Sequence, residues 1–107
     1  MVVKWSAVAE ERLKGIFDYY LHAAGNKVAM QLVVKVRDSV DSLRSMPLMA
    51  PLEKDLTDME PAFRSLIINR HYKAIYFIDD ENIMVVDIWD CRQNLVKLRR
   101  GIINTKN

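Results

Sequence analysis

Two stretches with helical spacing of apolar residues follow a short start that favours a β-strand. The start is Val2 to Trp5, and Ser6 stands where a helix N-cap is favoured. Apolar residues then recur at spacings of three and four until Gly25, a natural helix stop. A second amphipathic stretch runs from about Lys27 to Arg44. Because only Gly25 and Asn26 connect the two stretches, we expect the helices to be antiparallel neighbours.

The second half of the chain has the pattern of a β-meander. Three prolines between residues 47 and 61 indicate a loop, with one helical turn expected around Glu53 to Thr57. Arg64 to Asn69 alternates and is rich in Leu and Ile, and Tyr72 to Ile78 is dense in β-branched and aromatic residues. After a polar turn, Ile83 to Trp89 has the same character. We therefore predict three antiparallel strands.

The predicted fold class is α+β. It consists of an N-terminal strand and an antiparallel two-helix hairpin packed on a twisted, mainly antiparallel sheet, because neither layer can bury its apolar face alone. The other side of the sheet is then expected to be open or covered by a partner. A length of 107 residues fits one domain over residues 1–107, with a basic C-terminal tail over about 93–107.

Composition restricts the class of protein. Half of the residues are hydrophobic, which is typical of a globular chain, and the single cysteine excludes a disulfide framework or a cysteine-based zinc cluster. No apolar run reaches the length of about 18 residues that a membrane span needs. The first residues are acidic too early for a secretory signal. We therefore expect a cytoplasmic protein that does not contact a membrane.

The net charge of +2 hides an uneven distribution. Asp55 to Ala62 carries only acidic charges, whereas Phe63 to Ile78 carries only basic ones, and the chain from Arg92 onward has five basic residues and no acid. Basic stretches can contact phosphates or an acidic partner. The alternative is that they are solvated strand edges and an exposed tail.

Known catalytic and metal-binding motifs are mostly absent. The chain has no glycine-rich phosphate loop, no nucleophile elbow and no paired-histidine motif, so we expect neither a metal nor a cofactor. His22 and His71 are far apart in the chain, and only His71 adjoins basic residues. Cys91 is interpreted as a small packed thiol. Asp87 and Asp90, three apart in a strand, should face opposite sides and are expected to form salt bridges.

Three basic residues belong to the predicted sheet, and they are the main candidates for a site. Arg64 opens the first meander strand, Lys73 lies early in the second, and Arg92 follows the third. Adjacent strands could bring them onto one surface, where they could hold a phosphodiester and stabilise the charge that builds on it during cleavage. The alternative is that each pairs with Asp87, Asp90 or Glu60.

The ordered combination of these segments resembles toxins of the RelE/ParE superfamily, which belong to type II toxin-antitoxin systems and include plasmid stabilisation proteins. The resemblance covers nearly the whole chain up to about Leu98 and rests on these segments: the stretch from Ala9 to Tyr20, Met46-Pro47, Arg64-Ser65-Leu66, His71 to Ile78, and Ile88 to Asn94.

The resemblance implies a growth-inhibiting bacterial toxin that is neutralised by a cognate antitoxin wrapping its surface, with which it could form a hetero-oligomer. Members similar to RelE cut messenger RNA on the ribosome, whereas members similar to ParE poison DNA gyrase and cut nothing. Lys73 and Arg92 match catalytic positions of the cutting members, and Arg64 falls near a third. Together with His71, Arg99 and Arg100, Arg64 is expected to bind substrate.

The departure from the cutting members lies at Leu98. This leucine takes the place where those members carry an aromatic or histidine side chain, and leucine cannot exchange a proton. Arginine is a poor replacement because its pKa lies above about 12. Three functions therefore remain open: a ribosome-dependent mRNA endoribonuclease, a non-enzymatic inhibitor of gyrase, and a binding module that only holds its partner.

Overall fold

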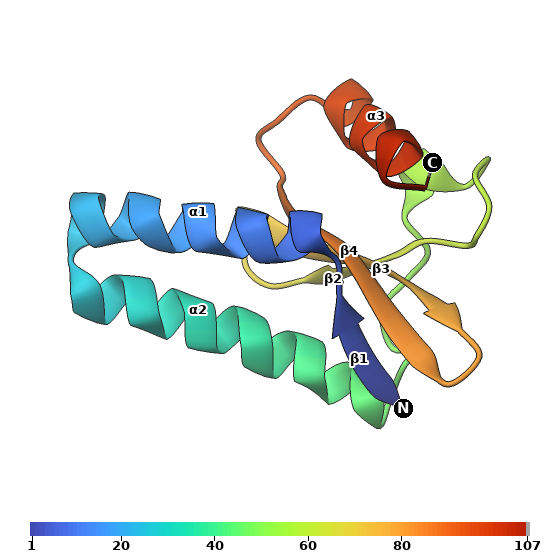
Figure 1. Ribbon diagram of the computed structural model, residues 1–107, viewed down its shortest axis with the longest axis horizontal. Helices are drawn as coiled ribbons and strands as arrows, with labels where there is room; N and C mark the ends of the chain where they lie inside the picture. Colours follow the sequence, from blue (N-terminus) through green and yellow to red (C-terminus); the bar gives the residue numbers. More distant parts are fainter. Residues whose placement is uncertain (107) are drawn as a thin grey trace.

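The computed structural model describes residues 1–106, with the side chains of residues 95 and 104–106 left out. Its elements follow one another along the chain as a strand, a helical hairpin, a loop with two short 3-10 helices, three strands and a last helix (Figure 1). In order, they are β1 (Val2–Trp5), α1 (Ala7–Ala24), α2 (Asn26–Asp41), η1 (Ser42–Arg44), η2 (Lys54–Leu56), β2 (Arg64–Ile67), β3 (Tyr72–Asp79), β4 (Asn82–Asp90) and α3 (Leu95–Lys106).

The helical hairpin forms where the sequence predicts it. The Ser6 hydroxyl caps α1 by accepting a hydrogen bond from the Ala9 N–H at 3.0 Å. Gly25, at φ 94°, is both the C-cap of α1 and the N-cap of α2, and this positive φ favours glycine. Asn26, which the sequence analysis placed in the connection, is the first residue of α2. One glycine is enough for the reversal, so the two helices lie antiparallel.

The four strands are ordered β1-β4-β3-β2. The last three strands form the predicted antiparallel meander, and β1 lies parallel to β4 at one edge. Because β1 pairs with β4 only from Asn82 to Val85, the second half of β4 has no strand of the described residues beside it on that side. The described residues thus form three α-helices and one mixed four-stranded sheet, which confirms the predicted α+β class.

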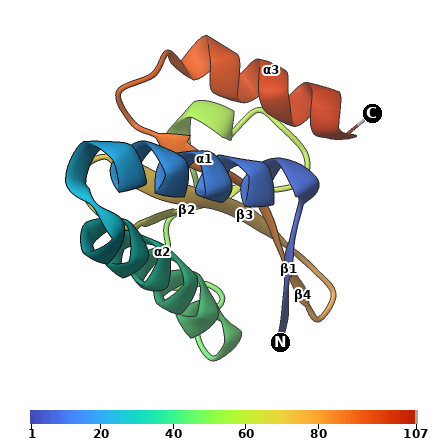
Figure 2. The same cartoon turned by 60° about the vertical axis from the view of Figure 1, so that its left-hand side comes forward.

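Both faces of the sheet are covered. The hairpin packs on one face around buried residues such as Leu13, Val36 and Tyr76, and we call this cluster the hairpin-side core. The sequence-based expectation that the other face is open or awaits a partner is wrong, because α3 packs there through Leu98 and Ile102 (Figure 2). These join a second cluster, the α3-side core, completed by Leu56, Phe63, Ile75 and Trp89.

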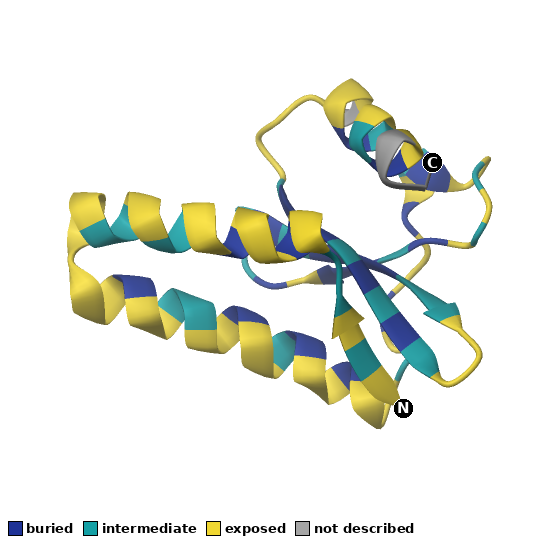
Figure 3. Ribbon diagram, in the orientation of Figure 1, coloured by how far each residue is buried: buried dark blue, intermediate teal, exposed yellow. Residues whose placement is uncertain are grey.

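Burial follows this layering. Buried residues lie along the central strands, and exposed residues lie along the outer sides of the helices (Figure 3). Much of the predicted basic tail is therefore a helix with one buried side, although Lys97 and Arg100 remain exposed. The side chain at position 106, which is also basic, and the whole of residue 107 are not described. No helix within the described part is long and apolar enough to cross a membrane.

Candidate functional site

The strand register separates two of the basic residues that the sequence suggested as one cluster. In the β2–β3 ladder, Arg64 pairs with Tyr76 and Lys73 pairs with Ile67. Side chains alternate between the faces of a strand, so residues three apart point to opposite sides. Since Tyr76 belongs to the hairpin-side core, Arg64 lies on that face and Lys73 on the α3 side. The two therefore do not share a surface.

Lys73 is bound to a buried carboxylate. Its Nζ lies 2.9 and 3.0 Å from the two carboxylate oxygens of Glu53, and the side chains are only 13% and 4% exposed. Burial raises the pKa of Glu53, but the hydrogen bonds from Lys73 and Ser65 outweigh burial and hold it below its ordinary value. The Lys73 ammonium thus stabilises an internal charge, a partner that the sequence analysis did not consider.

Arg64 contacts the loop beside β2. Its Nη1 donates a hydrogen bond to the Ala50 carbonyl at 2.8 Å. The backbone N–H of Ser65 donates to the Pro51 carbonyl at 3.0 Å, so the loop is fixed to β2 at two neighbouring points. The structure therefore places Arg64 as a support for residues 50 and 51.

Arg92 and His71 do lie at the same end of the sheet. The Arg92 guanidinium makes two 2.9 Å hydrogen bonds to the Asp90 carboxylate and lies 5.9 Å from the centre of the Tyr72 ring. The His71 ring meets the same Tyr72 ring edge-on, and its carbonyl accepts a 2.7 Å hydrogen bond from the Cys91 N–H. The expected salt bridge between Asp90 and Arg92 is thus present.

The two arginines of the tail have different surroundings. Arg99 makes two hydrogen bonds of 2.8 and 2.9 Å to the Asp58 carboxylate and one of 3.0 Å to the Asp55 carbonyl. It thereby fixes α3 to the acidic segment around η2. Arg100 is exposed. Neither Arg64 nor Lys73 belongs to this contact, so the six basic and histidine candidates are spread over several places.

Leu98 is not at an open catalytic position. It is 0% exposed and packs in the α3-side core, with Ile102 one turn further along the helix. An apolar side chain at this place stabilises the packing of α3 on the sheet. The departure that the sequence revealed therefore has a structural explanation.

The shifted pKa values at this end of the sheet do not favour proton transfer near neutral pH. The hydrogen bonds to Asp90 raise the pKa of Arg92 further, and the same bonds lower the pKa of Asp90. Burial, reinforced by the Tyr20 hydroxyl, raises the pKa of Tyr72. Partial desolvation also raises the pKa of the Cys91 thiol, although the residue is exposed and the packed thiol expected from the sequence is therefore wrong. Each change stabilises the protonation state that the group already has at neutral pH.

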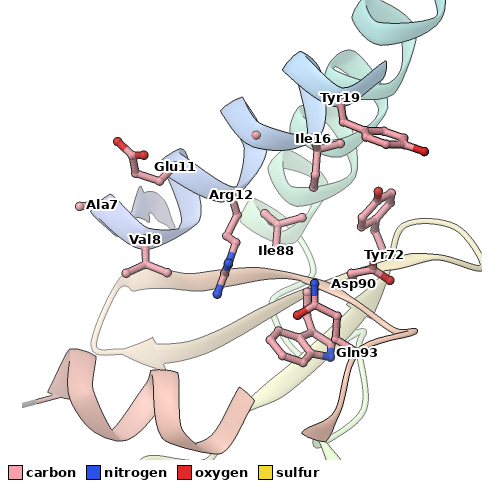
Figure 4. Close-up of a pocket in the computed structure, with 12 residues that line it drawn as sticks. Ala7, Val8, Glu11, Arg12, Ile16, Tyr19, Tyr72, Ile88, Asp90 and Gln93 are labelled. Atoms are coloured by element: carbon pink, nitrogen blue, oxygen red, sulfur yellow. The ribbon is translucent and has the colours of Figure 1, made fainter. Parts of the chain in front are cut away.

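A groove of about 550 Å³ runs between α1 and the second half of β4. Val8, Arg12 and Ile16 project from α1 toward β4, and Tyr19 lies near Tyr72 at one end (Figure 4). We call this the α1–β4 groove, and its lining residues are Ala7, Val8, Glu11, Arg12, Gly15, Ile16, Tyr19, Tyr72, Ile88, Trp89, Asp90 and Gln93.

Two features of the α1–β4 groove are unusual for a surface that faces only water. The Trp89 Nε1 is buried and has no hydrogen-bond partner among the described residues. A Cβ at Gly15 would have no heavy atom within 4 Å, so this mid-helix glycine has no packing reason within the described chain. A glycine inside a helix costs about 1 kcal/mol relative to alanine. The sequence pattern did not connect Gly15 with a site.

An ion pair between Arg12 and Asp87 joins α1 to β4 beside the groove. The Arg12 Nε lies 3.2 Å from the Asp87 carboxylate, whose side chain is 4% exposed, whereas that of Arg12 is 49% exposed. Burial raises the pKa of Asp87 above its ordinary value, and Arg12 and the Ile88 N–H offset this only in part. Ionised Asp87 is therefore less stable in the folded chain than in water.

Replacing Asp87 with asparagine is expected to leave the free energy of unfolding at pH 7 unchanged or to raise it by about 1 kcal/mol. The raised pKa of Asp87 means that its contribution to stability is present below the ordinary value of 3.8 and is lost as pH rises through the folded value. Urea unfolding at pH 7 and pH 3 measures this, and the advantage of Asp87→Asn should shrink at pH 3. If Asp87→Asn instead lowers the free energy of unfolding by more than about 2 kcal/mol at pH 7, the Arg12–Asp87 pair stabilises the fold by more than the burial of Asp87 destabilises it.

The fold described above is that of RelE/ParE-type toxins. The chain has a TM-score of 0.71 and 22% identity to the chromosomal ParDE TA system from P. aeruginosa, covering 84% of this chain and 95% of that one. It has a TM-score of 0.56 and 14% identity to the YoeB/ParE toxin from Agrobacterium tumefaciens, with coverages of 84% and 98%. It has a TM-score of 0.55 and 18% identity to the YoeB dimer from Staphylococcus aureus, covering 82% of this chain and 93% of that one.

The sequence itself carries the family signal. Residues 3–95 match the model of the ParE toxin of the type II toxin-antitoxin system parDE. The chain therefore belongs to the ParE toxin family, and the prediction of a type II toxin of the RelE/ParE superfamily is confirmed. No curated protein matches the sequence.

Proposed function

We propose that this toxin acts without catalysis, by binding DNA gyrase, and that a cognate antitoxin neutralises it. The observation that carries the proposal is the separation of Arg64 and Lys73 onto opposite faces of the sheet. RNA cleavage through the 2′-hydroxyl needs several groups converging on one phosphate. Here Lys73 is held by Glu53, Arg92 by Asp90, and Leu98 is buried. The match to the ParE family model supports the gyrase alternative only through the resemblance, which assigns gyrase poisoning to members similar to ParE.

The α1–β4 groove is, in this proposal, the docking site of an antitoxin helix. Its lining on α1 runs from Ala7 to Tyr19, which is about 18 Å of helix at 1.5 Å per residue. Gly15 lets a second helix approach the α1 backbone closely. Amphipathic helices commonly bind such apolar grooves.

Purified toxin tests the gyrase proposal. Supercoiling of relaxed plasmid by gyrase should decrease as toxin is added, and cleaved DNA should accumulate. Messages isolated from cells expressing the toxin should stay intact. Supercoiling that proceeds normally in excess toxin, together with messages cut at defined sites, would contradict the proposal and favour the nuclease.

Replacing Arg92 with alanine is expected to leave toxicity within about twofold of the original protein. The Arg92 side chain is 55% exposed and pairs with a partly exposed carboxylate, so its loss should change stability by less than about 1 kcal/mol. A nuclease that uses Arg92 at the scissile phosphate would instead lose a large factor. Growth of cells expressing Arg92→Ala without antitoxin measures the difference, with Arg100→Ala as the control for loss of a surface charge.

A further inference from the structure

One stripe of α1 faces the α1–β4 groove and has the spacing of a helix-packing seam. Its members, Val8, Arg12, Gly15 and Tyr19, all line the groove and follow one another at intervals of four, three and four residues. Residues at this spacing lie on one side of a helix and form the seam along which two helices pack. Val8 is 36% exposed and Tyr19 is 63% exposed, although both are large and mainly apolar. This α1 stripe therefore matches one half of a helix pair.

Arg12, in the middle of the α1 stripe, has hydrogen-bond donors to spare. Its Nε donates to the Asp87 carboxylate at 3.2 Å, and neither Nη group donates to any described residue. The guanidinium has N–H donors in a planar fork that fits a carboxylate. Asp87 is 4% exposed and holds the guanidinium against β4, while the Arg12 side chain stays 49% exposed. The fork is thus anchored at Nε, and its Nη groups remain available in the groove.

The other two charged residues that line the groove do not compete for Arg12. The Asp90 carboxylate is occupied by two hydrogen bonds from Arg92. Glu11 projects away from β4, whereas Arg12 projects toward it, next to the apolar side chain of Ile88 (Figure 4). An anion that binds Arg12 at this place is partly shielded from water, and shielding strengthens a charge-assisted hydrogen bond.

The unused donors indicate what a helix in the groove must carry. A helix that covered Arg12 with apolar side chains alone would bury donors without acceptors, which costs free energy. A carboxylate opposite Arg12 removes this cost through two parallel hydrogen bonds. The α1 stripe itself contains no carboxylate, so a second copy of the chain packed stripe against stripe would not supply one. Glu11 would repel an acidic residue placed on its own side of α1, which limits the acid to the position that faces Arg12.

We propose that Arg12 is the specificity-determining residue of the α1–β4 groove, and that it binds a glutamate or aspartate of the antitoxin helix. The acidic residue belongs to the apolar face of that helix, with apolar residues about one turn away on either side. A single polar contact inside an apolar seam fixes the register of two helices. This inference rests on the proposed function, in which the groove is the antitoxin site. It adds the chemistry by which the groove selects its occupant.

The test removes the charge of Arg12 without leaving a buried anion unpaired. The reference protein carries Asp87→Asn, whose amide oxygen can still accept the hydrogen bond from the Arg12 Nε. In this background Arg12→Met removes the guanidinium. Lys14→Met, at an exposed lysine of α1 that does not line the groove, is the matched control. Circular dichroism and thermal unfolding check the fold of each variant. The probe is the purified protein encoded beside the toxin gene, titrated by calorimetry at pH 7.

The Arg12→Met variant is expected to bind the probe about thirtyfold more weakly or worse, and the Lys14→Met variant to stay within about threefold of the reference. Arg12→Glu in the same background should bind more weakly still. Replacing the acidic residues of the probe with arginine, one at a time, should identify one position that restores binding to the Arg12→Glu toxin. Equal binding by the Arg12→Met and Lys14→Met variants overturns the inference.

Further outcomes separate this inference from the proposed function. If Gly15→Trp abolishes binding of the probe while Arg12→Met does not, the groove is the antitoxin site but Arg12 does not select its occupant. If neither substitution weakens binding, the inference and the assignment of the groove both fail. Inhibition of gyrase by the original toxin tests the target independently of either result. Unchanged binding of the probe, together with loss of self-association in sedimentation, would assign Arg12 to a second copy and overturn the inference.

Discussion

Replacing Lys73 with methionine should destabilise the fold by about 3–5 kcal/mol, because it leaves the Glu53 carboxylate buried without its cation. Domains of this size have a free energy of unfolding of about 5–15 kcal/mol, so the loss is a large fraction of the total. The melting temperature, followed by circular dichroism, should fall by more than about 10 °C. Lys35→Met, at an exposed lysine of α2, is the matched control and should change the melting temperature by little.

The pH dependence of this loss has a defined sign. The pKa of Glu53 is depressed from its ordinary value of 4.5, so its contribution to stability is present above that value and is lost as pH falls through the folded value. The difference between the original and Lys73→Met should therefore be largest near pH 7 and shrink below pH 4. Replacing Glu53 with leucine in the Lys73→Met background should recover much of the stability. A difference that stays constant from pH 7 to pH 3 would show that the ion pair is not its cause.

Replacing Gly15 with tryptophan should weaken antitoxin binding by at least a hundredfold while the toxin stays folded and toxic. The new side chain would fill the α1–β4 groove, where a Cβ has no heavy atom of the chain within 4 Å, and tryptophan has a higher helix propensity than glycine. Titration of labelled antitoxin measures the affinity, and co-expression tests whether growth is rescued.

Ala24→Trp provides the control for Gly15→Trp. Ala24 is exposed, lies at the far end of the same helix, and does not line the groove. The control should bind antitoxin as the original does. If the antitoxin neutralises Gly15→Trp as well as it neutralises the original toxin, it docks elsewhere. That outcome would leave the gyrase proposal untouched.

Local patterns were enough to predict the hairpin and the meander. Ser6 and Gly25 are strong helix boundaries whatever packs around them, and β-branched residues on either side of a polar turn favour two paired strands. The last helix was not recognised, because apolar positions such as Leu98 and Ile102 lie among basic residues that resemble a solvated tail. Its stability comes from the cluster around Trp89, which only the folded sheet assembles.

The candidate site depended on information that local patterns do not contain. Whether Arg64 and Lys73 share a face is decided by strand register, and a shift of one residue moves every side chain to the other side. The partner of Lys73 is Glu53, twenty residues earlier in a loop, and no spacing rule connects them. The groove depends on how α1 crosses β4, so Gly15 and Trp89 gain meaning only in three dimensions.

The two cores give the protein a built-in pair of optical reporters. Trp5 packs against the hairpin-side core with the Arg37 guanidinium 4.3 Å above its ring, and Trp89 is buried in the α3-side core. Indole emission depends on the polarity around the ring, so each tryptophan senses a different face of the sheet. Variants with a single tryptophan would allow events at α3 to be followed separately from events at the hairpin, without any added dye.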